Sequence, residues 1–177
     1  MRKKNNSIFT KLAFEQAKIN LGSTGINPSV GCIIEKNNTV ISSGYTGLKG
    51  RPHAEFNALK KNISFDGANA HITLEPCVHR GKTPPCVNIL IKKKIKKVYF
   101  PINDFDKRTA NKAIAILKKK KIYVKKGNFS TTAKKFYNSY YLNKKKNFPL
   151  IDAKIATSKD FFTINKKNKH ITNIYSR

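Results

Sequence analysis

Two short stretches of the sequence contain the side chains that could carry out chemistry. The first is His53-Ala54-Glu55, and the second runs from Pro76-Cys77 to Cys86, with eight residues between its two cysteines. One imidazole and two thiolates form an accepted ligand set for a catalytic zinc ion, which keeps a fourth position open for water. We therefore expect one Zn2+ per chain, with His53, Cys77 and Cys86 as its ligands.

The carboxylate of Glu55 is the candidate proton carrier beside this metal site. It lies two residues from the expected ligand His53, which suits a group that contacts the bound water and not the metal. It would take a proton from that water, pass it to a ring nitrogen of the substrate and then protonate the departing amine. A His-x-Glu followed by Pro-Cys-x-x-Cys is the signature of zinc deaminases, and in it the Glu is not a ligand. This sequence has the first half as stated, but its cysteines are farther apart.

The elements around these stretches should bring the four side chains into one crevice. Hydrophobic periodicity and turn signals predict helices over about 8–20, from 53 onward, and over 85–93, 109–119 and 131–142, and strands over 30–35, 39–45, 70–74, 97–100 and 122–124. The first two strands form an antiparallel hairpin, and single helices between the later strands imply right-handed crossovers and a largely parallel sheet. His53 and Cys86 then lie in the first turns of two helices, and Cys77 follows the end of a strand.

The length and composition favour one cytoplasmic domain with reduced thiols. The chain of 177 residues is long enough for one core and a short appendage. No apolar run reaches the roughly 18 residues of a membrane span, and no apolar segment behind the basic N-terminus suits a signal peptide. Three cysteines are too few and too unevenly placed for a disulfide framework. We expect Cys32, among aliphatic residues, to be a buried thiol and His71, in mid-strand, to be ordinary packing.

The net charge of +28 raises the question of a polyanionic partner. The lysines come in runs that are scattered along the whole chain, such as 92–94, 118–121 and 144–146. Scattered runs of this kind are typical of solvated faces, so we expect no nucleic-acid partner. Whether the lysines form a solvated surface or a nucleic-acid surface, the positive charge would favour a phosphorylated substrate.

The longer loop between the cysteines resembles one branch of the cytidine-deaminase-like superfamily. The residues that are similar to the deaminase domain of RibD-type riboflavin-biosynthesis proteins are Leu74-Glu75-Pro76-Cys77, His79 and Gly81-Lys82-Thr83-Pro84-Pro85-Cys86, with further matches at Asn27-Pro28, Val30-Gly31-Cys32 and 50–55. The resemblance covers about residues 8–142. It implies an α/β protein with a three-layer α-β-α cytidine-deaminase-like fold, whose mixed sheet has an N-terminal antiparallel hairpin followed by mostly parallel strands.

The resemblance also implies a substrate and a set of residue roles. The reaction would be zinc-dependent hydrolytic deamination of 2,5-diamino-6-(5-phosphoribosylamino)pyrimidin-4(3H)-one, which gives 5-amino-6-(5-phosphoribosylamino)uracil and ammonia. It assigns the metal and proton-transfer roles to the residues named above. The positions that line the substrate pocket in the family correspond to Asn27, His79 and Lys82.

Two positions depart from the family pattern. Many members have a histidine where this chain has Thr46, so a substrate contact there must be different or weaker. The segment 104–111 replaces a loop that is usually rich in proline and glycine, which leaves phosphate binding near that loop open.

Residues 147–177 differ from the expected deaminase domain, which covers residues 1–146. The stretch from Phe148 to Asp160 resembles the opening strand and turn of the reductase domain in bifunctional RibD proteins, and His170 stands where tryptophan is usual. About thirty residues cannot form a nucleotide-binding sheet, which needs several βα units. We therefore expect no reductase activity from this chain alone. We also expect a homo-oligomer, and leave the reductase step open to a separate partner.

Two other functions fit parts of the sequence. A deaminase that acts on a nucleobase in tRNA or DNA is favoured by the basic charge and opposed by the eight-residue loop. A zinc-binding protein that has lost turnover is suggested by the incomplete second half and the unusual loop around Phe105. The intact Glu55 argues against that alternative, because a purely structural zinc site has no use for it.

Overall fold

A five-stranded mixed sheet forms the centre of the protein. The computed structural model describes residues 2–81, 83–151, 153, 155–157, 159 and 161, and describes side chains from residue 7 onward. Its strands lie in the order β2-β1-β3-β4-β5. Their bounds are β1 Gly31–Lys36, β2 Thr39–Tyr45, β3 Asn69–Ile72, β4 Lys97–Phe100 and β5 Tyr123–Lys126.

The direction of the strands changes in the middle of the sheet. Strand β1 pairs antiparallel with both β2 and β3, whereas β3, β4 and β5 are parallel. The β1–β2 hairpin turns at Asn37 and Asn38, whose positive φ angles of 52° and 64° are those that a tight hairpin turn requires. The expected hairpin followed by parallel strands is confirmed, and the parallel part is limited to the three strands that crossover helices connect.

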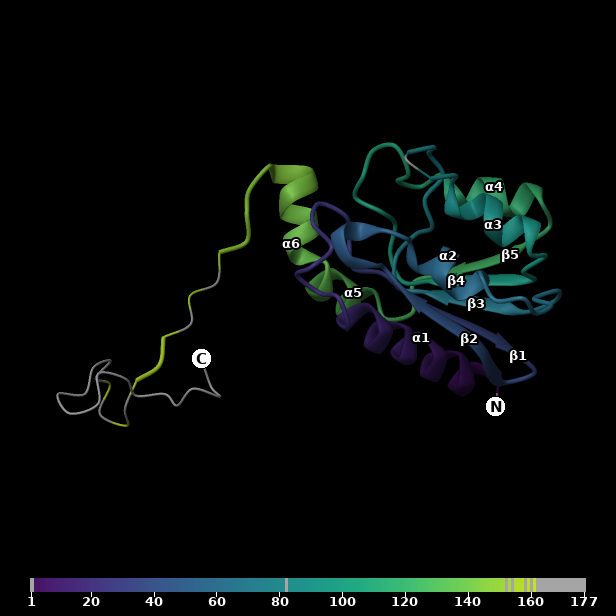
Figure 1. Cartoon of the computed structure of the whole chain (residues 1–177), viewed down its shortest axis with the longest axis horizontal. Helices are drawn as coiled ribbons and strands as arrows, with labels where there is room; N and C mark the ends of the chain where they lie inside the picture. Colours follow the sequence, from purple (N-terminus) through teal and green to yellow (C-terminus); the bar gives the residue numbers. More distant parts are fainter. Residues whose placement is uncertain are drawn as a thin grey trace.

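Helices cover both faces of the sheet, which gives the expected three layers (Figure 1). The helices are α1 Arg2–Lys18, α2 Ala54–Leu59, α3 Cys86–Lys92, α4 Ala113–Lys119, α5 Ser130–Phe136 and α6 Asn138–Tyr141. Helices α1 and α5 lie on one face, where Phe14 and Phe136 meet edge to face, and α2, α3 and α4 lie on the other. Among the residues that the structure describes, none of the helices combines the length and apolarity that a membrane span requires.

Two glycines allow helices to approach the sheet closely. A Cβ atom on Gly31 would lie 1.8 Å from the carbonyl oxygen of Ala13 in α1. A Cβ atom on Gly44 would lie 2.4 Å from the carbonyl oxygen of Ala54 and from the amide nitrogen of Ala58, both in α2. Side chains at these two positions would push the helices away from the sheet. Gly44 therefore matters for function as well, because α2 follows His53 directly and carries Glu55.

The first helix begins at Arg2 and not near residue 8 as predicted. Two further predicted helices begin or end elsewhere, for identifiable reasons. The helix expected from residue 109 begins only at Ala113, since the carboxylate of Glu75 accepts hydrogen bonds from the backbone N–H groups of Asn111 and Ala113. The helix expected over 131–142 is broken at Tyr137 into α5 and α6. The buried hydroxyl of Tyr137 donates to the carbonyl oxygen of Ser29, which fixes that residue against the sheet.

Only the first residues after the expected domain boundary at residue 146 are described in full. After α6 a π-helical turn, Leu142–Lys146, ends with Asn147 in the left-handed region, at φ 56°. The described residues that follow leave the helical layer (Figure 1), and Phe148 and Ile151 are exposed. Most of 152–177, including His170, lies outside the described residues. The boundary at residue 146 and the reductase-like segment stay predictions.

His71 is packed inside the protein, as expected. Its ring stacks on the ring of Tyr99, with centroids 4.6 Å apart, and contacts the ring of Phe9. Within the described part of the chain neither ring nitrogen has a hydrogen-bond partner. Burial lowers the pKa of His71 to about 4, because the charged form cannot be solvated there.

This buried imidazole should make the protein less stable in mild acid. The folded pKa of His71 lies below its unfolded value, so the unfolded chain binds the proton first as the pH falls through about 6.5. Between pH 7.5 and pH 5 we expect wild type to lose roughly 2 kcal/mol more unfolding free energy than a His71→Phe variant. Urea unfolding of both proteins at the two pH values measures this difference. Equal losses in the two proteins would contradict it.

Candidate active site

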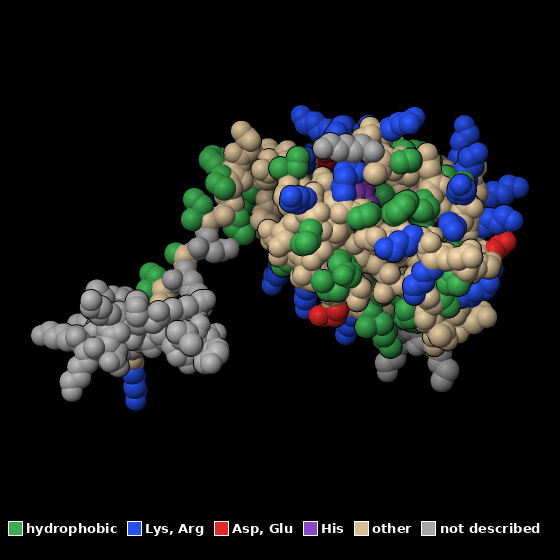
Figure 2. Space-filling view, viewed as in Figure 1, with side chains coloured by type: hydrophobic (Ala, Val, Ile, Leu, Met, Phe, Trp, Pro, Cys, Tyr) green, Lys and Arg blue, Asp and Glu red, His purple; other side chains and the backbone are tan. Residues whose placement is uncertain are grey.

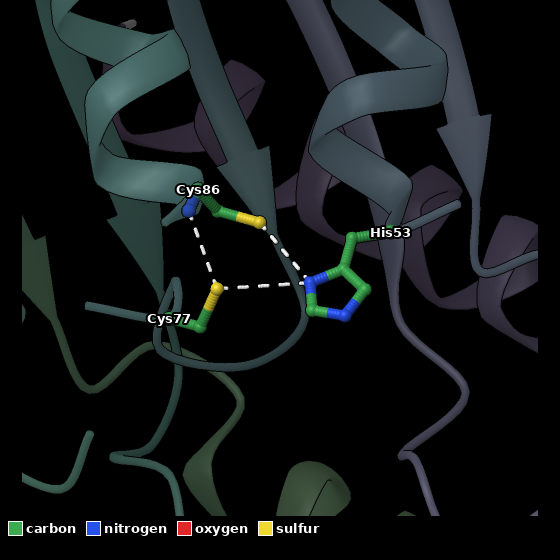
Figure 3. Close-up of side chains that lie close together, drawn as sticks. All are labelled: His53, Cys77 and Cys86. Atoms are coloured by element: carbon green, nitrogen blue, oxygen red, sulfur yellow. Dashed lines mark hydrogen bonds between the residues drawn. The ribbon is translucent and has the colours of Figure 1, made fainter. Parts of the chain in front are cut away.

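Three separate elements bring the expected metal ligands together (Figure 3). His53 is the residue directly before α2 and accepts the first helical hydrogen bond, from the amide of Asn57. Cys86 is the first residue of α3. Cys77 lies in the loop after β3, and its carbonyl oxygen accepts from the amide of Val87, which ties that loop to the start of α3. The expectation for Cys86 is confirmed, whereas His53 lies one residue before its helix and not inside the first turn.

The geometry of the three donor atoms fits a tetrahedral zinc ion. His53 Nδ1 lies 3.2 Å from Cys86 Sγ and 3.6 Å from Cys77 Sγ, and all three atoms lie within 4.8 Å of one another. Tetrahedral zinc with ordinary bond lengths places nitrogen and sulfur ligands about 3.6 Å apart. In Figure 3 the two sulfur atoms and Nδ1 point toward a common centre, and the second ring nitrogen of His53 points away from it. Nδ1 is therefore the atom of His53 that a zinc ion would bind.

The surroundings of Cys77 favour its thiolate, which is the form that binds metal. A hydrogen bond from the Cys86 thiol and another from the His53 ring lower the pKa of Cys77 to about 4, against the opposing effect of burial. The backbone N–H of Cys86 also donates to the Cys77 sulfur, at 3.2 Å. The thiolate of Cys77 in turn raises the pKa of His53. The three side chains thus interact with one another, and the negative charge on Cys77 favours the binding of a cation.

Glu55 lies in the buried first turn of α2, beside these ligands. Its side chain is 4% exposed and lines the same pocket as His53 and Cys77. Burial, followed by the charge of Cys77, raises the pKa of Glu55. A carboxyl group whose pKa moves toward neutrality can both accept and release a proton, which is what a proton shuttle requires.

Two of the three expected substrate residues line the pocket next to the ligands. This cavity has a volume of about 380 Å³, and Asn27 and His79 are among its lining residues. The side-chain nitrogen of Asn27 donates to the carbonyl oxygen of Gly50, so its orientation is fixed and its carbonyl oxygen is left for a ligand. His79 Nδ1 lies 3.0 Å from the hydroxyl of Thr109. Lys82 lies outside the described residues, and its role stays a prediction.

Thr46, which stands where many family members have histidine, also lines the pocket. Its hydroxyl accepts a hydrogen bond from the amide of Val30, at 2.9 Å, and donates to the carbonyl oxygen of the same residue. The hydroxyl is therefore engaged by backbone. Asn20 binds the carbonyl oxygen of Thr46 as well, so this residue serves to hold the pocket wall in place.

Glu75 organises one wall of the pocket, a role that the sequence did not reveal. Its buried carboxylate accepts three hydrogen bonds, from the backbone amides of Asp104, Asn111 and Ala113. It thereby holds the loop of residues 104–112 beside the loop that carries Cys77. The signal that the sequence offers is an acidic residue directly before Pro76-Cys77.

The far wall of the pocket comes from residues that are distant in sequence. The hydroxyl of Tyr140 donates to Asp104, at 3.0 Å, and the guanidinium of Arg108 binds both carboxylate oxygens of Asp106. Lys144 lies 3.6 Å from the same carboxylate. These charges hold the pKa of Asp106 well below its usual range, mainly through Arg108. The unusual segment 104–111 is thus a folded part of the pocket, linked to α6 and the turn after it.

Comparisons with known proteins agree with this site. The family model described as the cytidine and deoxycytidylate deaminase zinc-binding region matches residues 3–102. The chain is 39% identical over 146 residues to a diaminohydroxyphosphoribosylamino-pyrimidine deaminase of Buchnera aphidicola from Acyrthosiphon pisum, covering 82% of this chain and 99% of that protein. It is 39% identical over 156 residues to riboflavin biosynthesis protein RibD of Chlamydia trachomatis, covering 85% of this chain and 42% of that protein.

A solved structure shows the same fold. The crystal structure of a diaminohydroxyphosphoribosylaminopyrimidine deaminase/5-amino-6-(5-phosphoribosylamino)uracil reductase from Thermotoga maritima matches with a TM-score of 0.80 and 33% identity. The match covers 84% of this chain and 44% of that one. The chain therefore spans less than half the length of the bifunctional relatives, and nearly the whole length of the Buchnera protein.

Proposed function

The chain belongs to the cytidine and deoxycytidylate deaminase zinc-binding family and, within it, to the diaminohydroxyphosphoribosylamino-pyrimidine deaminases, and on this premise we propose a specific reaction. The substrate is 2,5-diamino-6-(5-phosphoribosylamino)pyrimidin-4(3H)-one. One water molecule is consumed, and 5-amino-6-(5-phosphoribosylamino)uracil and ammonia are released, as a step of riboflavin biosynthesis. The observation that carries the proposal is the convergence of His53, Cys77 and Cys86 within 4.8 Å at a pocket that buried Glu55 also lines.

Each residue of the site has a defined task in this reaction. Zinc held by the three ligands supplies the Lewis acidity that makes water nucleophilic near neutral pH. Glu55 accepts a proton of the attacking water and delivers it to a ring nitrogen of the pyrimidine. It then takes the proton of the hydroxyl group that the water has left on the ring carbon and gives it to the leaving amine, as the C–N bond breaks and the carbonyl forms. The side-chain carbonyl oxygen of Asn27 accepts a hydrogen bond from the edge of the pyrimidine, while its side-chain nitrogen stays bound to Gly50. His79, held by Thr109, meets the substrate farther from the metal.

The basic charge of the chain is the one observation that favours a nucleic-acid substrate. Lys and Arg side chains are spread around the face shown in Figure 2 and do not gather there into a single stripe. A spread-out charge of this kind is typical of a solvated surface. A cytoplasmic location, a homo-oligomeric state and a separate reductase partner accompany the proposed function as predictions.

Ammonia release from two substrates tests the proposal. Wild-type protein with its zinc content measured is incubated with the diaminopyrimidine ribosyl phosphate and, in parallel, with tRNA that contains adenosine. We expect zinc-dependent release from the pyrimidine alone. Release from tRNA alone would transfer the function to the nucleic-acid class, and zinc binding without release from either substrate would indicate a protein that has lost turnover.

A further inference from the structure

Arg51 places a fixed guanidinium at the wall of the active-site pocket. Its half-buried side chain lines the cavity together with His53. One terminal nitrogen donates to the hydroxyl of Thr83, at 2.6 Å. The other lies so near Gly81 that a Cβ atom there would come within 3.4 Å of it. The side chain of Arg51 therefore reaches from its own loop to the loop between the two cysteines, where it is bound to Thr83.

Within the described part of the chain, this guanidinium forms no ion pair with a carboxylate. Four acidic residues line the same pocket. Glu75 binds backbone amides, Asp106 binds Arg108, Asp104 accepts from Tyr140, and Glu55 lies beside the expected metal ligands. A guanidinium has five N–H donors, so Arg51 keeps donors that can bind an anionic ligand in the pocket. An anionic partner can therefore come from the ligand.

The other cations that bind a carboxylate in this pocket, Arg108 and Lys144, are less suited to an anion. The guanidinium of Arg108 donates hydrogen bonds to both carboxylate oxygens of Asp106, and Lys144 lies beside the same carboxylate. An incoming phosphate would have to compete with Asp106 for these cations and would be repelled by its charge. A phosphate next to Arg51 meets neither obstacle, and guanidinium groups bind phosphate oxygens in pairs with defined geometry.

We propose that Arg51 binds the phosphate group of the ribosyl phosphate substrate and thereby sets the preference for the phosphorylated form. This inference rests on the proposed function, because it presumes a phosphorylated substrate. Thr83 is a positioning residue that keeps the guanidinium turned into the pocket. The substrate then lies with its pyrimidine at the metal ligands and its phosphate against the Arg51 wall.

Inhibition by ribose 5-phosphate tests Arg51 directly. For Arg51→Gln we expect the inhibition constant of ribose 5-phosphate and the KM of the phosphorylated substrate to rise roughly 10- to 100-fold, the effect of losing a charged hydrogen bond. The zinc content and kcat should change far less. Arg51→Lys, which keeps the charge but not the fork, should give an intermediate result. Arg80→Gln is the matched control, because it removes the same charge from an exposed neighbour of Gly81 that does not line the pocket.

The possible results separate this inference from the proposed function. If wild type does not act on the pyrimidine at all, the proposed function fails. If wild type is active and Arg51→Gln raises both constants no more than Arg80→Gln does, the assignment of Arg51 is overturned. It is equally overturned if Arg108→Gln produces the larger rise, since the phosphate then lies beside Arg108. A purely structural role of Arg51 would lower kcat and zinc content without this selective weakening of phosphate binding.

Discussion

Replacing Glu55 with glutamine should lower kcat for ammonia release by roughly 100- to 10,000-fold while zinc stays bound. Glutamine has the same shape but cannot take a proton from water or deliver one to the substrate. Because burial already raises the pKa of Glu55, the neutral amide suits the site and should not destabilise the fold. The measurement is steady-state ammonia release, with zinc content and unfolding free energy determined on the same preparations.

A second acidic residue provides the control for this experiment. Glu15 on the outer side of α1 is exposed and pairs only with Lys18 in the described structure. Glu15→Gln makes the same chemical change far from the pocket and should leave kcat unaltered. If Glu55→Gln kept kcat within about tenfold of wild type with full zinc content, another group would have to carry the proton.

Replacing Cys77 with serine should strongly weaken zinc binding and abolish turnover. Loss of groups that merely orient metal ligands weakens binding by about 10- to 100-fold, so loss of a ligand should weaken zinc binding by roughly 100-fold or more. The sulfur of Cys77 also accepts hydrogen bonds from Cys86 and contacts His53, so the remaining two ligands lose their common partner. Zinc stoichiometry and retention against a graded series of chelators measure the effect.

The three cysteines of the chain make this test internally controlled. Cys32 is fully buried in β1 among apolar residues, which confirms its expected structural role, and it is absent from the cluster of metal-binding donors. Cys32→Ser should keep one zinc per chain and lose about 1–3 kcal/mol of unfolding free energy, because its hydroxyl has no partner there. Zinc loss in Cys32→Ser, or full zinc retention in Cys77→Ser, would contradict the ligand assignment.

The sequence was sufficient for those features that depend on local patterns. The hairpin followed from two apolar runs around Asn37 and Asn38, whose backbone tolerates the left-handed conformation. The ligand set followed from residue types next to predicted helix starts and strand ends, which are positions that converge at one edge of an α/β sheet. Local signals were less reliable at helix ends, where side chains from elsewhere decide which backbone groups are paired.

Only the tertiary structure decided how the walls of the pocket are built. The start of α4 depends on Glu75, which lies 38 positions before Ala113, and no local pattern reports such a hydrogen bond. Tyr140 and Lys144 reach the pocket through the packing of the last helices. Arg51, one of 37 Lys and Arg residues, is singled out by its place in the pocket wall and its hydrogen bond to Thr83. The sequence thus shows which residues can bind a metal, because the ability to bind a metal is a property of the residue type. Which charges face a substrate depends on contacts between distant segments, and these exist only once the chain has folded.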